Sequence, residues 1–113
     1  MFTGTSAGGL LSGVWGTAEN DVYAVGADGF TLHYNGSAWS RMTSETTENL
    51  YSVWGNGSND IYAVGVSGTV LHYDGSSWNS MNSGTSAILW QVLATPFDVF
   101  AVGSGGAILR KTS

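Results

Sequence analysis

One repeated motif dominates this sequence, because the stretch HYNGSAW at residues 33–39 returns as HYDGSSW at residues 72–78. Residues 11–49 align with residues 50–88 without a gap, and about half of the aligned positions are identical. Residues 89–113 give a third copy after one loop deletion. A repeat of this length predicts one supersecondary unit built three times, whose copies stack to bury a shared core.

Each copy contains short runs with the chemistry of β-strands. Residues 50–55 (LYSVWG), 60–65 (DIYAVG) and 69–74 (TVLHYD) are rich in Val, Ile, Tyr and Trp, and they are separated by Gly, Asn, Asp and Ser. A fourth run begins at Trp78. No helical periodicity extends over ten residues. The sequence therefore predicts four antiparallel strands per copy.

The connections between these runs carry turn signals. Asn35-Gly36 and Asp74-Gly75 stand between the third and fourth runs and predict type I′ hairpin turns, which need positive φ at both central positions. The stretches GADGF, GVSGT and GSGGA stand between the second and third runs, where glycine permits a tight connection.

Four antiparallel strands in about 40 residues, repeated, are the pattern of a β-propeller blade. A sandwich or a jelly roll offers no reason for a repeat at this spacing. We therefore predict an all-β chain, a β-propeller with three four-stranded antiparallel blades, as a single partial propeller over residues 1–113. Its repeats are residues 11–49, 50–88, and 89–113 completed by 1–10.

The pattern VWG, NDVYAVG and LHYDGSSW resembles the propeller repeats of bacterial secreted and surface proteins, which are loosely related to BNR and Asp-box propellers. The resemblance implies a propeller fold and an extracellular or cell-surface origin. The resemblance indicates little about activity, because such repeats occur in proteins of many functions. The stretch from Asp74 to Trp78 is one residue shorter than an Asp box, and Asp boxes are structural turns.

The repeat register places the two ends of the chain in one hairpin. Thr112 and Ser113 align with Asp74 and Gly75, and residues 1–3 align with residues 79–81. Joining the ends would leave out only the counterparts of Ser76, Ser77 and Trp78. What fills the position of this third Trp stays open: Phe2, a side chain of another chain, or nothing.

Three blades are too few to close a ring, since propellers have four to eight. Exposed blade faces favour association, and a cyclic homo-oligomer covers these faces by symmetry. We predict a head-to-tail homodimer with six blades, in which residues 1–6 of one chain pair with residues 106–111 of the other. Three chains would give nine blades, which is rare, and a fragment of a longer propeller is the alternative. The predicted oligomer interface comprises Met1, Phe2, Leu109, Arg110 and Lys111.

Composition excludes several classes of partner and site. Arg41, Arg110 and Lys111 are the three basic residues, and the net charge is −5, so we expect no nucleic acid partner. The chain has no cysteine, which excludes disulfides and thiolate metal sites. No apolar run approaches 18 residues and no signal peptide is visible, so we expect no membrane insertion.

The copies vary most in the linkers and in the innermost strand, where Ser12, Tyr51 and Trp90 are equivalent. Tyr51 and Trp90, with Glu45 and Glu48 of the neighbouring linker, are candidate ligand-binding residues for a carbohydrate, because a flat ring covers a sugar face. The alternative is that the two rings fill the central channel or a blade interface.

The other repeated side chains are expected to be structural. Trp15 and Trp54, and likewise Trp39 and Trp78, recur with the blade, which favours packing over sugar stacking. The aspartates that open the second strands are expected to hydrogen-bond locally; they are Asp21, Asp60 and Asp98. The histidines at equivalent positions in two copies give way to arginine in the third, unlike a zinc or catalytic histidine; the three residues are His33, His72 and Arg110.

No GxSxG, no HExxH and no isolated carboxylate pair is present, so we expect no enzyme, no metal and no cofactor. Two hypotheses of function remain. The first is a propeller assembly unit that acts as a binding module, lectin-like in architecture. The second is a purely structural or engineered propeller, or a fragment, that oligomerises without a specific ligand.

Overall fold

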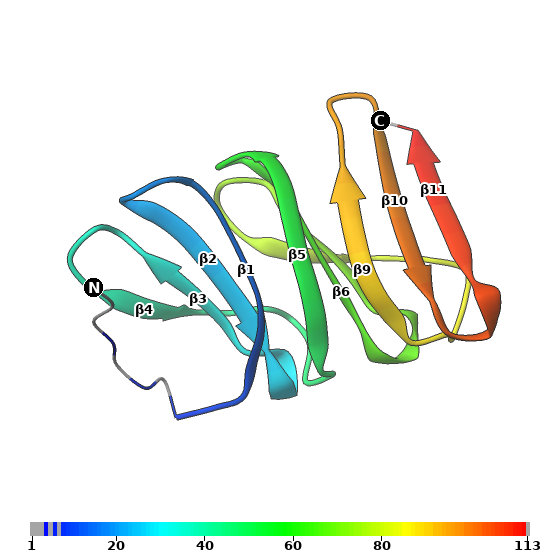
Figure 1. The fold of residues 1–113 in the computed structure, drawn as a ribbon, viewed down its shortest axis with the longest axis horizontal. Coiled ribbons are helices and arrows are strands. Elements are labelled where there is room, and N and C mark those ends of the chain that lie inside the picture. Colours follow the sequence, from blue (N-terminus) through cyan, green and yellow to red (C-terminus); the bar gives the residue numbers. More distant parts are fainter. Residues whose placement is uncertain (1–3, 5, 7, 113) are drawn as a thin grey trace.

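The computed structural model describes residues 4, 6 and 8–112, and it contains three antiparallel sheets that follow one another along the chain (Figure 1). The first sheet contains β1 (Leu11–Ala18), β2 (Asp21–Gly26), β3 (Thr31–Tyr34) and β4 (Trp39–Met42). The second contains β5 (Leu50–Gly57), β6 (Asp60–Gly65), β7 (Val70–Tyr73) and β8 (Trp78–Met81). The third contains β9 (Leu89–Ala94), β10 (Asp98–Gly103) and β11 (Ile108–Thr112).

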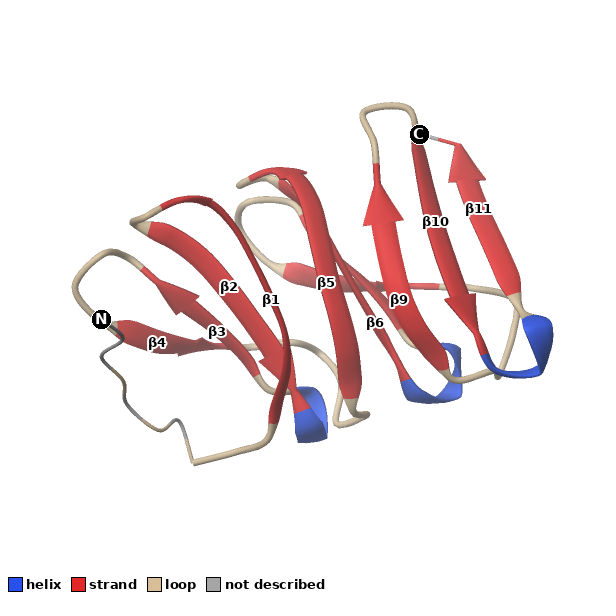
Figure 2. Cartoon of the chain, viewed as in Figure 1, coloured by secondary structure: helices blue, strands red, loops and turns tan. Residues whose placement is uncertain are grey.

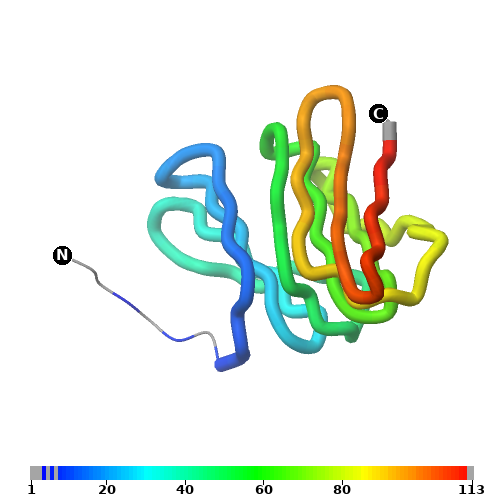
Figure 3. Tube along the Cα trace, turned by 45° about the vertical axis from the view of Figure 1, so that its right-hand side comes forward, coloured from blue at the N-terminus to red at the C-terminus, as the bar shows by residue number. Residues whose placement is uncertain are grey.

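The three sheets are arranged as adjacent propeller blades, here named blades 1, 2 and 3 in chain order. The first strands of the blades, β1, β5 and β9, lie side by side, and the later strands of each blade follow outward from them (Figures 1 and 3). Each strand pairs with its sequence neighbour in antiparallel register. The all-β prediction and the antiparallel blades are thereby confirmed.

Blade 3 has three strands within the described residues, and its predicted fourth strand falls on residues of a neighbouring chain. The fourth strand was expected from residues 1–10, and Met1 and Phe2 lie outside the described residues. Leu109, Arg110 and Lys111 belong to β11, which pairs only with β10 among the described residues. Closure of a ring by a second chain stays a prediction.

A short 3₁₀ turn joins the second and third strands of every blade, at one end of the molecule (Figure 2). These turns are η1 (Ala27–Gly29), η2 (Val66–Gly68) and η3 (Ser104–Gly106). The middle and last residues of each turn have positive φ, which explains the glycine at the last position. The predicted tight connections are therefore present.

The hairpins between the third and fourth strands are not the predicted type I′ turns. Positive φ occurs at Gly36 but not at Asn35, and the Asn35 N–H donates to the Ala38 carbonyl at 3.2 Å. Gly36 is thus the first central residue of a type II′-like turn. Asn35 precedes the turn, where its Oδ1 accepts hydrogen bonds from the backbone N–H groups of Ser37 and Ala38. The equivalent turn at Asp74 repeats this arrangement.

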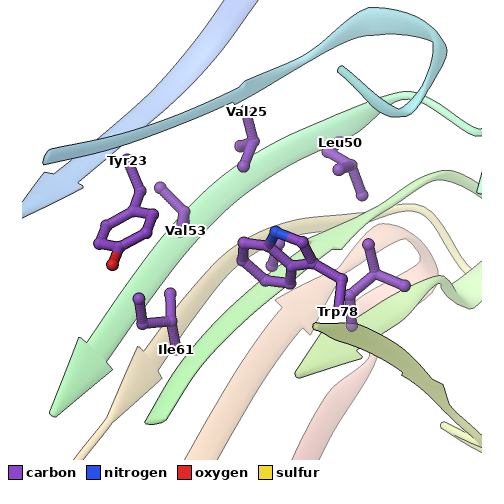
Figure 4. Packing of buried hydrophobic residues seen from close by; sticks show 8 residues of the cluster. Tyr23, Val25, Leu50, Val53, Ile61 and Trp78 are labelled. Carbon is purple, nitrogen blue, oxygen red and sulfur yellow. The ribbon is translucent and has the colours of Figure 1, made fainter. Parts of the chain in front are cut away.

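The core lies between blades rather than within one. One cluster joins Tyr23 and Val25 of blade 1 to a set of blade 2 residues; that set is Leu50, Val53, Ile61, Ala63, Leu71 and Trp78. Figure 4 shows Trp78 lying against this cluster. A second cluster joins Tyr62 and Val64 of blade 2 to blade 3 in the same way. Each blade therefore buries its apolar face only where a neighbour covers it.

Candidate functional site

Tyr51 and Trp90 form an aromatic pair on the inner strands of blades 2 and 3. Each is the second residue of its strand, β5 or β9, and their ring centroids lie 5.0 Å apart with an interplanar angle of 31°. The Trp90 side chain is 49% exposed. The structure thus brings together two residues that the sequence singled out, and about half of the Trp90 side chain is available to a ligand.

A groove of about 640 Å³ runs along the inner strands beside this pair. Its polar lining includes Ser12, Ser52 and the exposed Gln91. The two serines also link the blades, because Ser12 Oγ donates to the Leu50 carbonyl and Ser52 Oγ accepts from the Val92 N–H. The groove therefore combines apolar rings with a few polar groups, which is the usual composition of a ligand site.

Glu45 and Glu48 lie in the loop between β4 and β5, and neither lines the groove of the aromatic pair. Glu45 is exposed, has a positive φ of 71°, and lines a separate shallow pocket with Arg41. Glu48 is half-buried, and its N–H donates to Thr46 Oγ1 at 3.1 Å. Of the four predicted ligand-binding residues, the two rings thus share one groove, Glu45 lines a separate pocket, and Glu48 lines neither.

A recurring Asp–His–Tyr cluster links the second and third strands of blades 1 and 2. In blade 1, His33 Nε2 lies 2.8 Å from Asp21 Oδ1, and the His33 ring packs on Tyr23 with centroids 4.6 Å apart. In blade 2, His72 Nε2 lies 2.8 Å from Asp60 Oδ1. The histidines therefore hold neighbouring strands together, in the structural role that the sequence predicted.

Burial and hydrogen bonds act in opposite directions on the aspartates of these clusters. Burial raises the pKa of Asp21, but hydrogen bonds from Thr17, His33 and Tyr23 outweigh it and leave that pKa below its ordinary value. The pKa of Asp60 is lowered in the same way, by Asn56 together with the His72 and Tyr62 side chains. Both carboxylates are therefore fixed as acceptors at neutral pH.

Blade 3 contains a modified version of the cluster. Arg110 Nη2 lies 3.1 Å from Asp98 Oδ1, and Phe100 stands where the other blades have tyrosine. From the sequence, the aspartates and the histidines were each expected to be structural, but their pairing was not predicted. One signal was present: the copy that changes His to Arg also changes Tyr to Phe, as expected for residues in contact.

The part of the chain that the structure describes contains no group of three or more His, Cys, Asp or Glu side chains that is arranged to hold a metal ion. None of the helices in residues 4, 6 and 8–112 has the length and apolar character needed to cross a membrane.

Comparison with known proteins gives a fold. No family model and no curated protein matches this chain. The solved structure of YCF48 bound to D1 peptide matches with a TM-score of 0.78 and 19% identity, over 93% of this chain and 38% of that chain. YCF48 from Cyanidioschyzon merolae matches with a TM-score of 0.72 and 20% identity, over 88% of this chain and 36% of that chain. Both likenesses concern less than two-fifths of the neighbour's length, and they show a part of a β-propeller.

Proposed function

We propose that this chain is a non-enzymatic β-propeller assembly unit, which associates head to tail with a second copy and binds a ligand on its inner strands. The observation that carries the association is a contrast in burial between equivalent residues. Leu50 and Leu89 are fully buried at blade interfaces, whereas their counterpart in blade 1, Leu11, is 46% exposed. Val14 is 68% exposed, although its counterparts in the other blades are buried.

Blade 3 exposes the complementary face. Val25 and Val64 are fully buried against the following blade, whereas their counterpart Val102 is 42% exposed. Phe100, the counterpart of buried Tyr23 and Tyr62, is half-buried. The chain's own interfaces supply the template for association, because Val25 packs in one cluster with Leu50 and Val53. In the proposed dimer, Val102 of one copy packs against Leu11 and Val14 of the other.

The η turns support the same pairing. Gly68 lies directly under the carbonyl of Thr85, in the loop that leads into the next blade, and Gly29 lies under the carbonyl of Thr46. Gly106 has the same backbone conformation, with φ of 76°, but nothing lies within 4 Å of the position of its Cβ. The covering loop would come from the residues before β1 of the second copy, which align with those two loops.

Sedimentation velocity of the 113-residue chain tests the association. A mass of two chains is expected, and Val102→Asp should reduce it to one by placing a charge in the interface. Phe97→Asp is the matched control, because Phe97 is an exposed apolar residue in the β9–β10 turn rather than on the blade face. A monomer at tens of micromolar would refute the proposal, and a trimer would replace the six-bladed ring with nine blades.

For the ligand we favour a short peptide held over the Tyr51–Trp90 pair. The fold neighbour YCF48 was solved with a D1 peptide, which supports a peptide partner for this chain. Because the net charge is −5, a neutral or basic peptide is favoured over an acidic one. The aromatic pair, in which Trp90 is exposed, also suits a carbohydrate, and this lectin-like role is the second candidate.

Isothermal titration with a panel of neutral and basic peptides and with simple sugars separates the two candidates. Trp90→Ala should abolish binding of whichever class binds, while Phe97→Ala, which also removes an exposed aromatic ring, should leave it unchanged. Binding that survives Trp90→Ala would place the ligand elsewhere. A dimer that binds neither class would favour the alternative of a purely structural propeller.

A further inference from the structure

A second pocket, of about 490 Å³, lies between blades 2 and 3 on the side of their outer strands. Its walls are mostly apolar; they include Tyr62, Val64, Val92, Val99, Ala101 and Leu109. All six belong to, or pack against, the core cluster that joins these two blades. The pocket therefore reaches into the core between these two blades, and its lining also includes Asn82, Ser83, Arg110 and Lys111.

At the equivalent position between blades 1 and 2, an indole fills the space. Trp78 of β8 is 1% exposed and packs in the cluster between blades 1 and 2. The walls around it are the repeat counterparts of the walls of the pocket; they are Tyr23, Val25, Val53, Ile61, Ala63 and Leu71. Blade 3 has no fourth strand among the described residues, and the described lining of its pocket contains no tryptophan.

The strand beside the pocket has an open edge. In blade 2, β7 pairs with β8 in a register that sets Tyr73 opposite Trp78 and Leu71 opposite Ser80. β11 is the counterpart of β7, and it pairs with β10 alone among residues 4, 6 and 8–112. An exposed edge offers unpaired backbone groups to an incoming strand. By the register of blade 2, a tryptophan on that strand would lie opposite Lys111.

We propose that β11 and this pocket form a binding site for an extended peptide segment that carries a tryptophan, in the manner of Ser76–Met81. The segment adds as a fourth strand to blade 3, and its indole enters the pocket between blades 2 and 3. This is β-strand addition, in which the backbone supplies hydrogen bonds and a side-chain pocket supplies selectivity. The site is separate from the inner-strand groove of the proposed function.

The indole is recognised by its shape and its apolar surface. Among the described residues, Trp78 Nε1 has no hydrogen-bond partner although it is buried. The site between blades 1 and 2 therefore makes no hydrogen bond to the indole. The Tyr73 ring packs on Trp78 with centroids 5.2 Å apart, and Lys111 replaces Tyr73 in blade 3. The pocket in blade 3 therefore lacks the aromatic ring contact that Tyr73 makes in blade 2. The positive charge of Lys111 favours a neutral or acidic segment over a basic one.

The test uses a fluorescein-labelled peptide with the sequence of residues 75–81, GSSWNSM, titrated with the 113-residue chain and followed by fluorescence anisotropy. Replacing its tryptophan by alanine should weaken binding by at least about 10-fold, because a buried aromatic anchor dominates such interfaces. Replacing it by naphthylalanine should retain binding, because no hydrogen bond is lost. Equal binding of the tryptophan and alanine peptides, or no binding at millimolar protein, would overturn the proposal.

Hydrogen exchange locates the peptide without changing the protein. Bound peptide should slow exchange of the amides in residues 108–112 and leave the inner strand 50–57 unchanged. Protection confined to the inner strands would also overturn the proposal. Sedimentation in the presence of peptide reads self-association separately: a peptide-bound dimer supports independent sites, and a peptide-bound monomer supports competition for β11 by the second copy.

Discussion

Trp39 and Trp78 hold the same position in blades 1 and 2, yet Trp39 is 39% exposed and Trp78 is 1% exposed. Both begin the outer strand, and both pack on the tyrosine that precedes the hairpin, Tyr34 or Tyr73, with centroids 5.1 and 5.2 Å apart. They differ because blade 1 covers Trp78, whereas among the described residues no blade lies on the other side of blade 1. Burial in this protein is thus set by the neighbouring blade.

This pair of tryptophans gives the first prediction. Trp78→Ala should lower the free energy of unfolding by about 3–5 kcal/mol, the usual cost of removing a buried aromatic side chain. Trp39→Ala should cost less in the isolated chain but should weaken self-association, because Trp39 lies on the open face of blade 1. Urea denaturation and sedimentation measure the two effects. Equal losses of stability would contradict the proposal that blade 1 lacks its neighbour.

The second prediction concerns the glycines that end the η turns. Gly68→Ala places a methyl group against the Thr85 carbonyl oxygen, so it should destabilise the chain by more than the backbone strain of about 1 kcal/mol. Gly106→Ala meets nothing within 4 Å and should cost only that strain in a monomer. In the proposed dimer it should also block association. Thermal melts and sedimentation of the two variants, side by side, distinguish an open from a covered turn.

The third prediction is a loss of stability in acid. The folded-state pKa values of Asp21 and Asp60 lie below the ordinary value of 3.8, so the unfolded chain takes up protons first as the pH falls. The stabilisation is therefore complete above about pH 4–5 and is lost as the pH drops through the lowered pKa values.

Melting temperatures at pH 6 and pH 2.5 measure this effect. The double variant Asp21→Asn, Asp60→Asn should be less stable at pH 6 and should lose less on acidification than the parent chain. An equal loss in both proteins would show that other carboxyl groups carry the acid sensitivity. Asp74 is a third carboxyl group with a lowered pKa; the backbone N–H groups of Ser77 and Ser76 are the main cause, and His72 contributes less.

The sequence predicted the strands and the blades because both depend on local signals, short apolar runs that recur at a nearly constant spacing along the chain. The hairpin type was wrong for a physical reason: Asn35 and Asp74 use their side chains to cap the turn, which moves the glycine to the first central position. A dipeptide such as Asn-Gly indicates that a turn is favoured, but it does not indicate which backbone N–H groups the Asn or Asp side chain will accept hydrogen bonds from.

The candidate site was predicted in part. Tyr51 and Trp90 meet because the inner strands of neighbouring blades lie side by side, so equivalent positions become neighbours in space. Glu45 is close to Tyr51 in sequence, but it lies in the loop before β5 and lines a different pocket, so chain proximity was misleading. The pocket between blades 2 and 3 was foreseen only as a missing tryptophan, since its walls come from two different repeats.

The last prediction concerns an extension of the chain that would fill the pocket between blades 2 and 3. By the repeat register, Ser113 aligns with Gly75, so adding the residues Ser-Ser-Trp-Asn-Ser-Met after it should complete a hairpin and a fourth strand on β11. Burying the added indole should raise the free energy of unfolding by about 2–3 kcal/mol. The matched control carries alanine in place of the added tryptophan and should gain much less, since it can pair with β11 but cannot fill the pocket. Urea denaturation measures both chains, and the extended chain should no longer bind the GSSWNSM peptide. If the two extensions stabilise the protein equally, the pocket does not select an indole, and strand pairing alone accounts for the gain.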